Sequence, residues 1–483
     1  MVVGEARAMS ESTAPGKMRD AAVRGSTIIV AGSILSAGLR FGSNLIITRL
    51  LLPEHFGLMA IVNVLALGLA LFSDVGVGPN IIQNQRGDQP RFLDTAWTVQ
   101  VSRGFILWIL SCVLAWPLAL LYEQESLTVL LPVVGITAVI GGFESTNLFT
   151  LNRALSFMRI TVLELVVQLS GAIAMIVVAW LYHSVWALVV ATLVSSVART
   201  VLSHVMLPGH RNRFAWDRDA ARSLFTFGRW ILVSTAVTYL AGQTDRLALG
   251  KLVTPAELGL YSIAATLASM PTQILVQLAQ KVFFPVVAAA LRDSPEARGG
   301  VRRSRANLVV TLAPLLALAV AMAPAAVELL YDERYRATGQ LASLLSIAAW
   351  FGTLSHSYGV VLLAAGRPQS LTLANVVKTI TFAVLVWPVA SRFGLTGVTL
   401  LVAVGELGFL VTAQLACRRE GVVGVVADVG ATLLGAVLVA LYLGAHHLLS
   451  QVLPWPVLPF GVVALLGLGI TAVLAKKTRL LGR

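Results

Sequence analysis

The chain has 483 residues, of which 57% are hydrophobic and only 12% are charged, and its formal net charge is +13. A soluble domain of this length needs a larger share of charged surface, so the composition excludes an ordinary soluble protein. The basic residues lie mostly between long apolar runs, and no basic patch alternates with exposed aromatic residues, so nucleic acid is not an expected partner. The two cysteines, Cys112 and Cys417, have no metal-binding spacing, and no metal or cofactor is predicted.

The apolar runs predict membrane-spanning helices, because a hydrocarbon layer about 30 Å thick needs about 20 apolar residues and offers the backbone no other hydrogen-bond partner. After a disordered cytoplasmic segment over residues 1–24, fourteen helices are predicted. They begin near Gly25, Phe56, Thr95, Leu127, Met158, Ser184, Arg222, Leu258, Ala306, Gln340, Ser370, Leu395, Val423 and Trp455. The expected fold class is an all-α polytopic membrane protein.

The basic residues predict the orientation of these helices. With a cytoplasmic N-terminus, the cytoplasmic loops and both tails hold roughly 24 arginines and lysines, whereas the outer loops hold roughly six. One cytoplasmic loop, for example, contains Arg298, Arg302, Arg303 and Arg305. This bias predicts a multi-pass protein of the bacterial inner membrane with both termini in the cytoplasm.

A sequence repeat divides the chain into two halves. Residues 49–61 and 251–263 match at one fixed offset, so that Pro53 and Gly57 correspond to Pro255 and Gly259. Because six helices separate the copies, both halves should have the same orientation, related by a pseudo-twofold axis along the membrane normal. We expect an N-terminal six-helix bundle (25–208), a cytoplasmic linker (209–221), a C-terminal six-helix bundle (222–417), and two further helices with a basic cytoplasmic tail (418–483).

Several motifs resemble those of a known family. They are residues 48–57 (TRLLLPEHFG), 74–78 (DVGVG), 227–230 (FGRW), 245–246 (DR), 258–264 (LGLYSIA) and 283–285 (FFP). Over about residues 25–419 the chain resembles the polysaccharide transporters, Wzx-type flippases of the multidrug, oligosaccharidyl-lipid and polysaccharide exporter superfamily. The resemblance implies alternating-access translocation of polyprenyl-diphosphate-linked oligosaccharides for exopolysaccharide, capsule or O-antigen assembly. It also makes membrane lipids, a polysaccharide polymerase and export machinery candidate partners.

Charged residues within the apolar helices are the candidate site, because such groups are costly in a membrane. The diphosphate of this cargo is strongly anionic, and a guanidinium pairs well with phosphate oxygens. The predicted substrate-binding residues of a cationic central cavity are Arg40, Arg103, Arg229, Asp245, Arg246, Lys281 and Lys378. Asp74 and Glu406 are predicted to carry the coupling ion. The alternative is structural, in that acids such as Glu144 and Glu164 pair with basic residues of neighbouring helices.

Other functions remain open at this point. A flippase for a lipid-linked peptidoglycan precursor fits the same helix count and basic cavity. A cation-coupled multidrug exporter would need an acidic cavity, which the basic excess disfavours. A membrane polymerase or ligase would need a long outer loop with catalytic groups, and no ATP-binding motif is present, so no enzymatic activity is predicted. The sugar, the coupling ion and the oligomeric state do not follow from the sequence.

Overall fold

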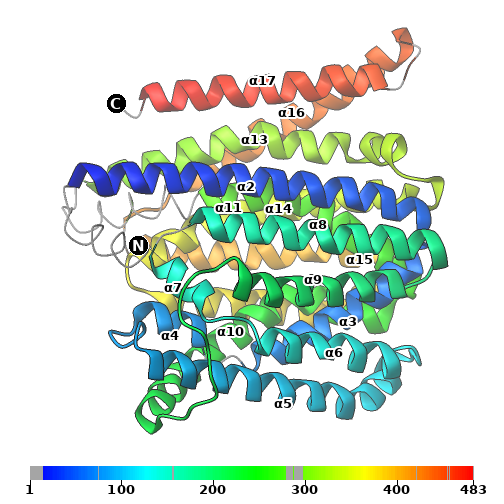
Figure 1. Cartoon of the computed structure of the whole chain (residues 1–483). Coiled ribbons are helices and arrows are strands. Elements are labelled where there is room, and N and C mark those ends of the chain that lie inside the picture. Colours follow the sequence, from blue (N-terminus) through cyan, green and yellow to red (C-terminus); the bar gives the residue numbers. More distant parts are fainter. Residues whose placement is uncertain are drawn as a thin grey trace. The chain divides into compact units, whose positions relative to one another are not determined.

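The computed structural model describes residues 15–73, 76–154, 157–278, 287, 297–419, 421–453, 455 and 457–481. Throughout these residues the secondary structure is helical, without a strand, which confirms the all-α fold class (Figure 1). The first half contains α2 (Pro15–Leu50), α3 (Pro53–Leu71), α4 (Val77–Gln83), α5 (Pro90–Tyr122), α6 (Leu127–Gly142), α7 (Asn147–Arg153), α8 (Phe157–Tyr182) and α9 (Trp186–Val205). The second half contains α10 (Arg218–Leu252), α11 (Pro255–Leu278), α13 (Ala297–Leu330), the short η2 (Glu333–Tyr335), α14 (Arg336–Ala364), α15 (Pro368–Arg418), α16 (Val425–Val452) and α17 (Val457–Leu481).

The helices have the length and composition of membrane spans. Nine of those described are long and apolar enough to cross a bilayer, and the bent pair α6–α7 makes a tenth. The protein is therefore a multi-pass membrane protein. The count of fourteen crossings stays a prediction.

The N-terminal helix is longer than predicted. Residues 1–14 lie outside the described residues, but α2 already begins at Pro15, so the predicted disorder of residues 15–24 is wrong. Proline is well suited to the first turn of a helix, and the lysine, arginines, methionine and alanines that follow it have high helix propensity. These local preferences outweigh the polar composition on which the prediction of disorder was based.

One long helix contains a break that separates two predicted spans. Within α15, Gly394 has φ 58° and ψ −152°, a backbone conformation that is essentially restricted to glycine. The predicted helices starting near Ser370 and Leu395 therefore meet at this residue. The break lets the chain turn back, so that the two parts of α15 contact each other through Lys378 and Glu406.

Contacts between Cα atoms divide the chain into two compact units. The first comprises Met1–Asn44, Leu69–Leu118 and Leu127–Val233, and the second comprises Leu45–Gly68, Ala119–Ser126 and Ser234–Arg483. In the first unit α9 packs against α6 and α8. In the second unit α14 packs against α11, α13 and α15, while α16 and α17 both pack against α13. The boundaries predicted for the two six-helix bundles stay predictions.

The two copies of the sequence repeat contact each other inside the second unit. A Cβ atom added to Gly57 of α3 would overlap the carbonyl oxygen of Pro255, and one added to Gly259 of α11 would overlap the carbonyl oxygen of Pro53. The same added atoms would lie 3.0 Å from the Gly259 nitrogen and 3.1 Å from the Gly57 nitrogen. The contact is thus reciprocal, as the predicted pseudo-twofold relation requires.

Candidate functional site

A cluster of ionisable side chains lies among four helices of the second unit. Lys378, in the first part of α15, forms an ion pair through Nζ with Glu406 Oε1, in the second part of the same helix. The two side chains are only 22% and 16% exposed. Asp245 of α10 accepts a hydrogen bond from the hydroxyl of Tyr261 of α11. These residues come together because the break at Gly394 and the packing of α14 on α11 and α15 bring distant segments into contact.

Two polar cavities open beside this cluster, and Asp245 and Glu406 line both of them. The smaller, of about 200 Å³, is lined by Ala241, Gly242, Thr244, Asp245, Lys378, Thr379, Phe382, Val402, Gly405 and Glu406. The larger, of about 280 Å³, is lined by Asp245, Tyr261, Ala265, Ala268, Ser269, Thr272, Leu345, Ala348, Ala349, Gly352, Thr353, His356, Val402 and Glu406. Hydroxyl, carboxylate, ammonium and imidazole groups therefore meet in space large enough for water or part of a ligand.

His356 of α14 was missed by the sequence analysis. Its Nε2 atom is buried and has no hydrogen-bond partner among the described residues, although the side chain lines the larger cavity with Glu406. A titratable side chain in the middle of an apolar helix was the signal that could have identified it. The cluster therefore combines the carboxyl groups of Asp245 and Glu406, the amino group of Lys378 and the imidazole of His356. No group of three metal-ligating side chains is present in the described ranges.

Other predicted site residues have different surroundings. Arg246 donates from Nη1 to Gln243 Oε1 at 3.1 Å, and its buried Nε lacks a partner among the described residues. Arg103 donates from Nε to Ser73 Oγ at 3.0 Å and from Nη2 to the carbonyl of Ala70, so it satisfies the C-terminal end of α3. Arg103 therefore also has a structural role in the first unit.

The remaining predicted positions are less defined. Arg40 is exposed on α2 in the first unit. Arg229 lies within α10, but its side chain lies outside the described residues, as do Asp74 and Lys281 altogether. Of the nine predicted residues, the structure thus brings together Asp245, Lys378 and Glu406.

Two acidic residues of the first unit, Glu144 and Glu164, have the surroundings that the structural alternative predicts. Arg199 of α9 donates from Nε to Glu144 at 2.7 Å and from Nη1 to the carboxylate of Glu164 at 2.9 Å. This arrangement pairs acid and base between α9, α8 and the turn after α6.

Arg305, which the sequence analysis placed in a cytoplasmic loop, is instead fully buried in α13. It forms an ion pair with Asp428 of α16, donates to Ser357 Oγ at 3.0 Å, and stacks 3.6 Å from the centre of the Tyr358 ring. Asp428 also accepts hydrogen bonds from Tyr358 Oη at 2.6 Å and from Gln414 Nε2 at 3.0 Å. This network fastens α16 to α13, α14 and α15.

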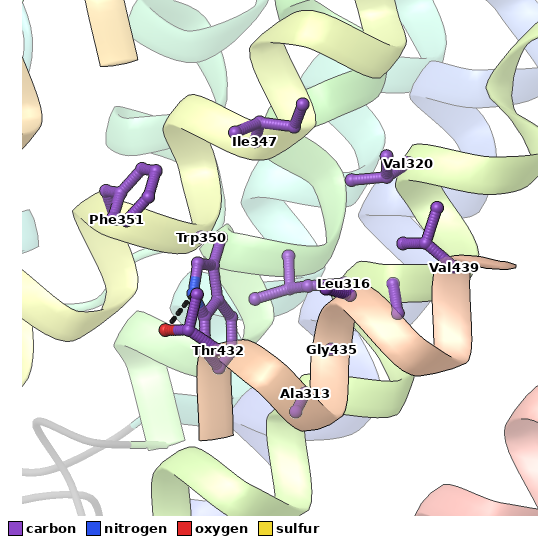
Figure 2. A pocket seen from close by; sticks show the side chains of 11 residues that line it. Ala313, Leu316, Val320, Ile347, Trp350, Phe351, Thr432, Gly435 and Val439 are labelled. Atoms are coloured by element: carbon purple, nitrogen blue, oxygen red, sulfur yellow. Dashed lines mark hydrogen bonds between the residues drawn. The ribbon is translucent and has the colours of Figure 1, made fainter. Parts of the chain in front are cut away.

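A separate cavity of about 300 Å³ lies between α13, α14 and α16, and its walls are almost entirely apolar. Figure 2 shows Leu316, Val320, Ile347 and Phe351 around this space, with the indole nitrogen of Trp350 donating to Thr432 Oγ1 at 3.0 Å. Since its one polar side-chain pair is already satisfied, this cavity offers no group that would hold an ion or a phosphate.

The fold has solved counterparts. The structure of the lipid II flippase MurJ in an inward closed conformation covers 95% of this chain and 100% of its own, with a TM-score of 0.66 and 11% sequence identity. At this identity the likeness concerns the fold alone, that of a polytopic membrane protein. Residues 46–339 match the model of the polysaccharide biosynthesis protein family. The chain belongs to this family.

Two of the curated relatives match over a smaller share of this chain than MurJ does. The teichuronic acid biosynthesis protein TuaB of Bacillus subtilis is 22% identical over 61% of this chain and 61% of its own length. The succinoglycan biosynthesis transport protein ExoT of Rhizobium meliloti is 24% identical over 66% of this chain and 65% of its own length. The chain thus spans a little under two thirds of these relatives.

Proposed function

We propose that the protein is a flippase that carries polyprenyl-diphosphate-linked oligosaccharides across the bacterial inner membrane by alternating access. The proposal is supported by the family, by relatives named for teichuronic acid biosynthesis and for succinoglycan biosynthesis transport, and by the fold of a lipid flippase. Both termini are cytoplasmic in this proposal, and the protein has no catalytic step.

The observation that carries the mechanism is the partly buried ion pair of Lys378 and Glu406 beside the polar cavities. Lys378 is the ammonium that would bind a diphosphate oxygen of the cargo. While it does so, Glu406 loses its counter-ion, and a carboxylate left unpaired in a poorly solvated site takes up a proton. Release of the cargo restores the pair and frees the proton.

Asp245 and His356 complete this exchange. Asp245 is held by Tyr261 and keeps the neighbourhood negative, which favours retention of a proton near Glu406. The unpaired imidazole nitrogen of His356 can pass that proton between Glu406 and the larger cavity. Cargo binding and proton binding are thereby coupled, because one proton is taken up with each cargo molecule and is released with it.

A flippase for a peptidoglycan precursor would use the same chemistry, because its cargo is also a lipid-linked diphosphate. The two flippase readings differ only in which glycolipid is accepted.

Transport in proteoliposomes tests the proposal. The assay measures translocation of a polyprenyl-diphosphate oligosaccharide by the unaltered protein, by Lys378→Gln and by Lys251→Gln. Lys251 is the matched control, because it pairs with Glu123 at an exposed position. We expect the unaltered protein and Lys251→Gln to flip the lipid and Lys378→Gln to be at least about tenfold slower, which corresponds to the loss of one charge-assisted contact. Export of a cationic drug without movement of any glycolipid would overturn the proposal.

A further inference from the structure

The connection between α9 and α10 presents basic and aromatic side chains to the surroundings. This segment, residues 206–217, is called the strap here, and it runs along one end of the first unit (Figure 1). Exposed side chains on the strap and the first turns of α10 are Arg211, Arg213, Phe214, Trp216, Arg218 and Arg222. Phe214 is 66% exposed and Trp216 is 60% exposed. From the sequence we expected no basic stretch with exposed aromatic residues, and these exposed rings beside arginines show that this expectation was wrong.

The strap is fixed by side chains of α5. Asp94 accepts hydrogen bonds from the backbone nitrogen of Arg213 at 2.9 Å and contacts His210 Nε2 at 2.7 Å. Thr98 Oγ1 accepts from the nitrogen of Ala215 at 3.1 Å, and Thr95 Oγ1 accepts from the nitrogen of Asp217 at 3.0 Å. Because α5 holds the backbone, the arginine and aromatic side chains are displayed at fixed positions.

The acidic groups of the strap do not neutralise its arginines. Asp217 forms an ion pair with Arg86 at 3.3 Å. It also accepts hydrogen bonds from the backbone nitrogens of Asp219 and Ala220, at 2.9 and 3.1 Å. These hydrogen bonds, the one from Ala220 foremost, and the charge of Arg86 lower the pKa of Asp217. The carboxylate of Asp217 is therefore ionised, and it already has Arg86 and two backbone nitrogens as partners. In the described part of the chain, no acidic side chain forms an ion pair with the four exposed arginines 211, 213, 218 and 222.

The length and composition of α5 indicate that the strap lies near a membrane surface. α5 has 33 residues, so at 1.5 Å per residue it is about 50 Å long and extends about 20 Å beyond a hydrocarbon layer of about 30 Å. The strap is bound at Asp94, Thr95 and Thr98, within the first ten residues of α5, which precede the long apolar run of that helix. Aromatic and basic residues together at this depth are typical of an interface with lipid headgroups.

We propose that the strap binds the phosphate headgroups of anionic phospholipids. Arg211 and Arg213 would pair with phosphate oxygens, and the rings of Phe214 and Trp216 would lie among the headgroups. This surface is separate from the Lys378 cluster, so lipid binding at the strap does not depend on the transport proposal.

Lipid titration of the full chain tests this inference. Purified protein in neutral detergent is titrated with phosphatidylglycerol and, separately, with phosphatidylcholine, and bound lipid is counted by native mass spectrometry. The variants are Arg211→Gln/Arg213→Gln, the charge-preserving Arg211→Lys/Arg213→Lys, and a matched control, Arg336→Gln/Arg392→Gln, which removes two exposed arginines elsewhere. We expect the affinity for phosphatidylglycerol to be about tenfold lower in Arg211→Gln/Arg213→Gln only. At high salt, the unaltered protein should lose its preference for phosphatidylglycerol over phosphatidylcholine.

Two results would overturn it. One is unchanged phosphatidylglycerol affinity in Arg211→Gln/Arg213→Gln. The other is an equal loss in the control, which would point to net charge instead of this surface, or in the lysine variant, which keeps the charge and would point to misfolding. Binding of an oligonucleotide in preference to phosphatidylglycerol would likewise contradict the choice of lipid as the partner.

Discussion

Gly57 and Gly259 pack against each other's helix so closely that neither position has room for a methyl group. Each glycine faces the carbonyl oxygen of the proline that begins the opposite helix, Pro255 or Pro53. A neighbouring backbone cannot move aside as a flexible side chain can. The repeated Pro-x-x-x-Gly motif is therefore explained by a contact between its own two copies.

Substitution of either glycine should separate α3 from α11. We expect Gly57→Ala and Gly259→Ala each to destabilise the protein by about 1–3 kcal/mol, the usual cost of an overpacked contact. Gly444→Ala on α16 is the control, because the space around Gly444 is open. Thermal unfolding in detergent measures the effect, and equal melting temperatures for all three variants would refute the close contact.

The break in α15 should be equally sensitive. Gly394 has φ 58° and ψ −152°, so Gly394→Ala forces a side chain into a conformation that costs about 1–3 kcal/mol. Relief of that strain would alter the angle between the two parts of α15 and thus the contact of Lys378 with Glu406. We expect slower transport, whereas Gly430→Ala, at an open position of α16, should leave the rate unchanged. Normal transport by Gly394→Ala would show that the break is dispensable.

The stability lost on removing Arg305 should depend on whether the charge of Asp428 is still present. Arg305→Met leaves Asp428 buried without its counter-ion, and we expect a loss of about 3–5 kcal/mol in stability. The double variant Arg305→Met/Asp428→Leu should recover much of this loss, because neither charge remains buried. Arg302→Met, an exposed change on the same helix, serves as the control. Unfolding in increasing denaturant distinguishes these variants, and additive losses in the double variant would argue against the pair.

The exposed pair of Lys251 and Glu123 should give a small pH dependence. The hydrogen bond and charge of Lys251 lower the pKa of Glu123 below its ordinary value of 4.5. The carboxylate therefore adds stability that is fully present above pH 4.5 and is lost as the pH falls through the lower folded-state pKa. We expect the difference in melting temperature between the unaltered protein and Glu123→Gln to shrink below that pH. A constant difference from pH 7 to pH 3 would be inconsistent with the pair.

The fold was largely predictable from the sequence, because apolar runs form helices locally and the repeat containing Gly57 and Gly259 is a direct match between two segments. The ion pair of Lys378 and Glu406 was not predictable, since it depends on the reversal at Gly394. Arg305 was misplaced because one buried arginine next to several exposed ones looks like part of a basic loop. His356 was missed because a lone histidine in an apolar helix has no motif around it.

Proton uptake on cargo binding tests the central claim most directly. A polyprenyl-diphosphate oligosaccharide is added to the purified protein in weakly buffered detergent solution near neutral pH, and the change in pH is recorded with the bound fraction. If the cargo displaces Glu406 from Lys378, about one proton is taken up for each bound molecule, and Glu406→Gln binds the cargo without that uptake. Binding by the unaltered protein without proton uptake, or equal uptake by Glu406→Gln, would contradict the exchange.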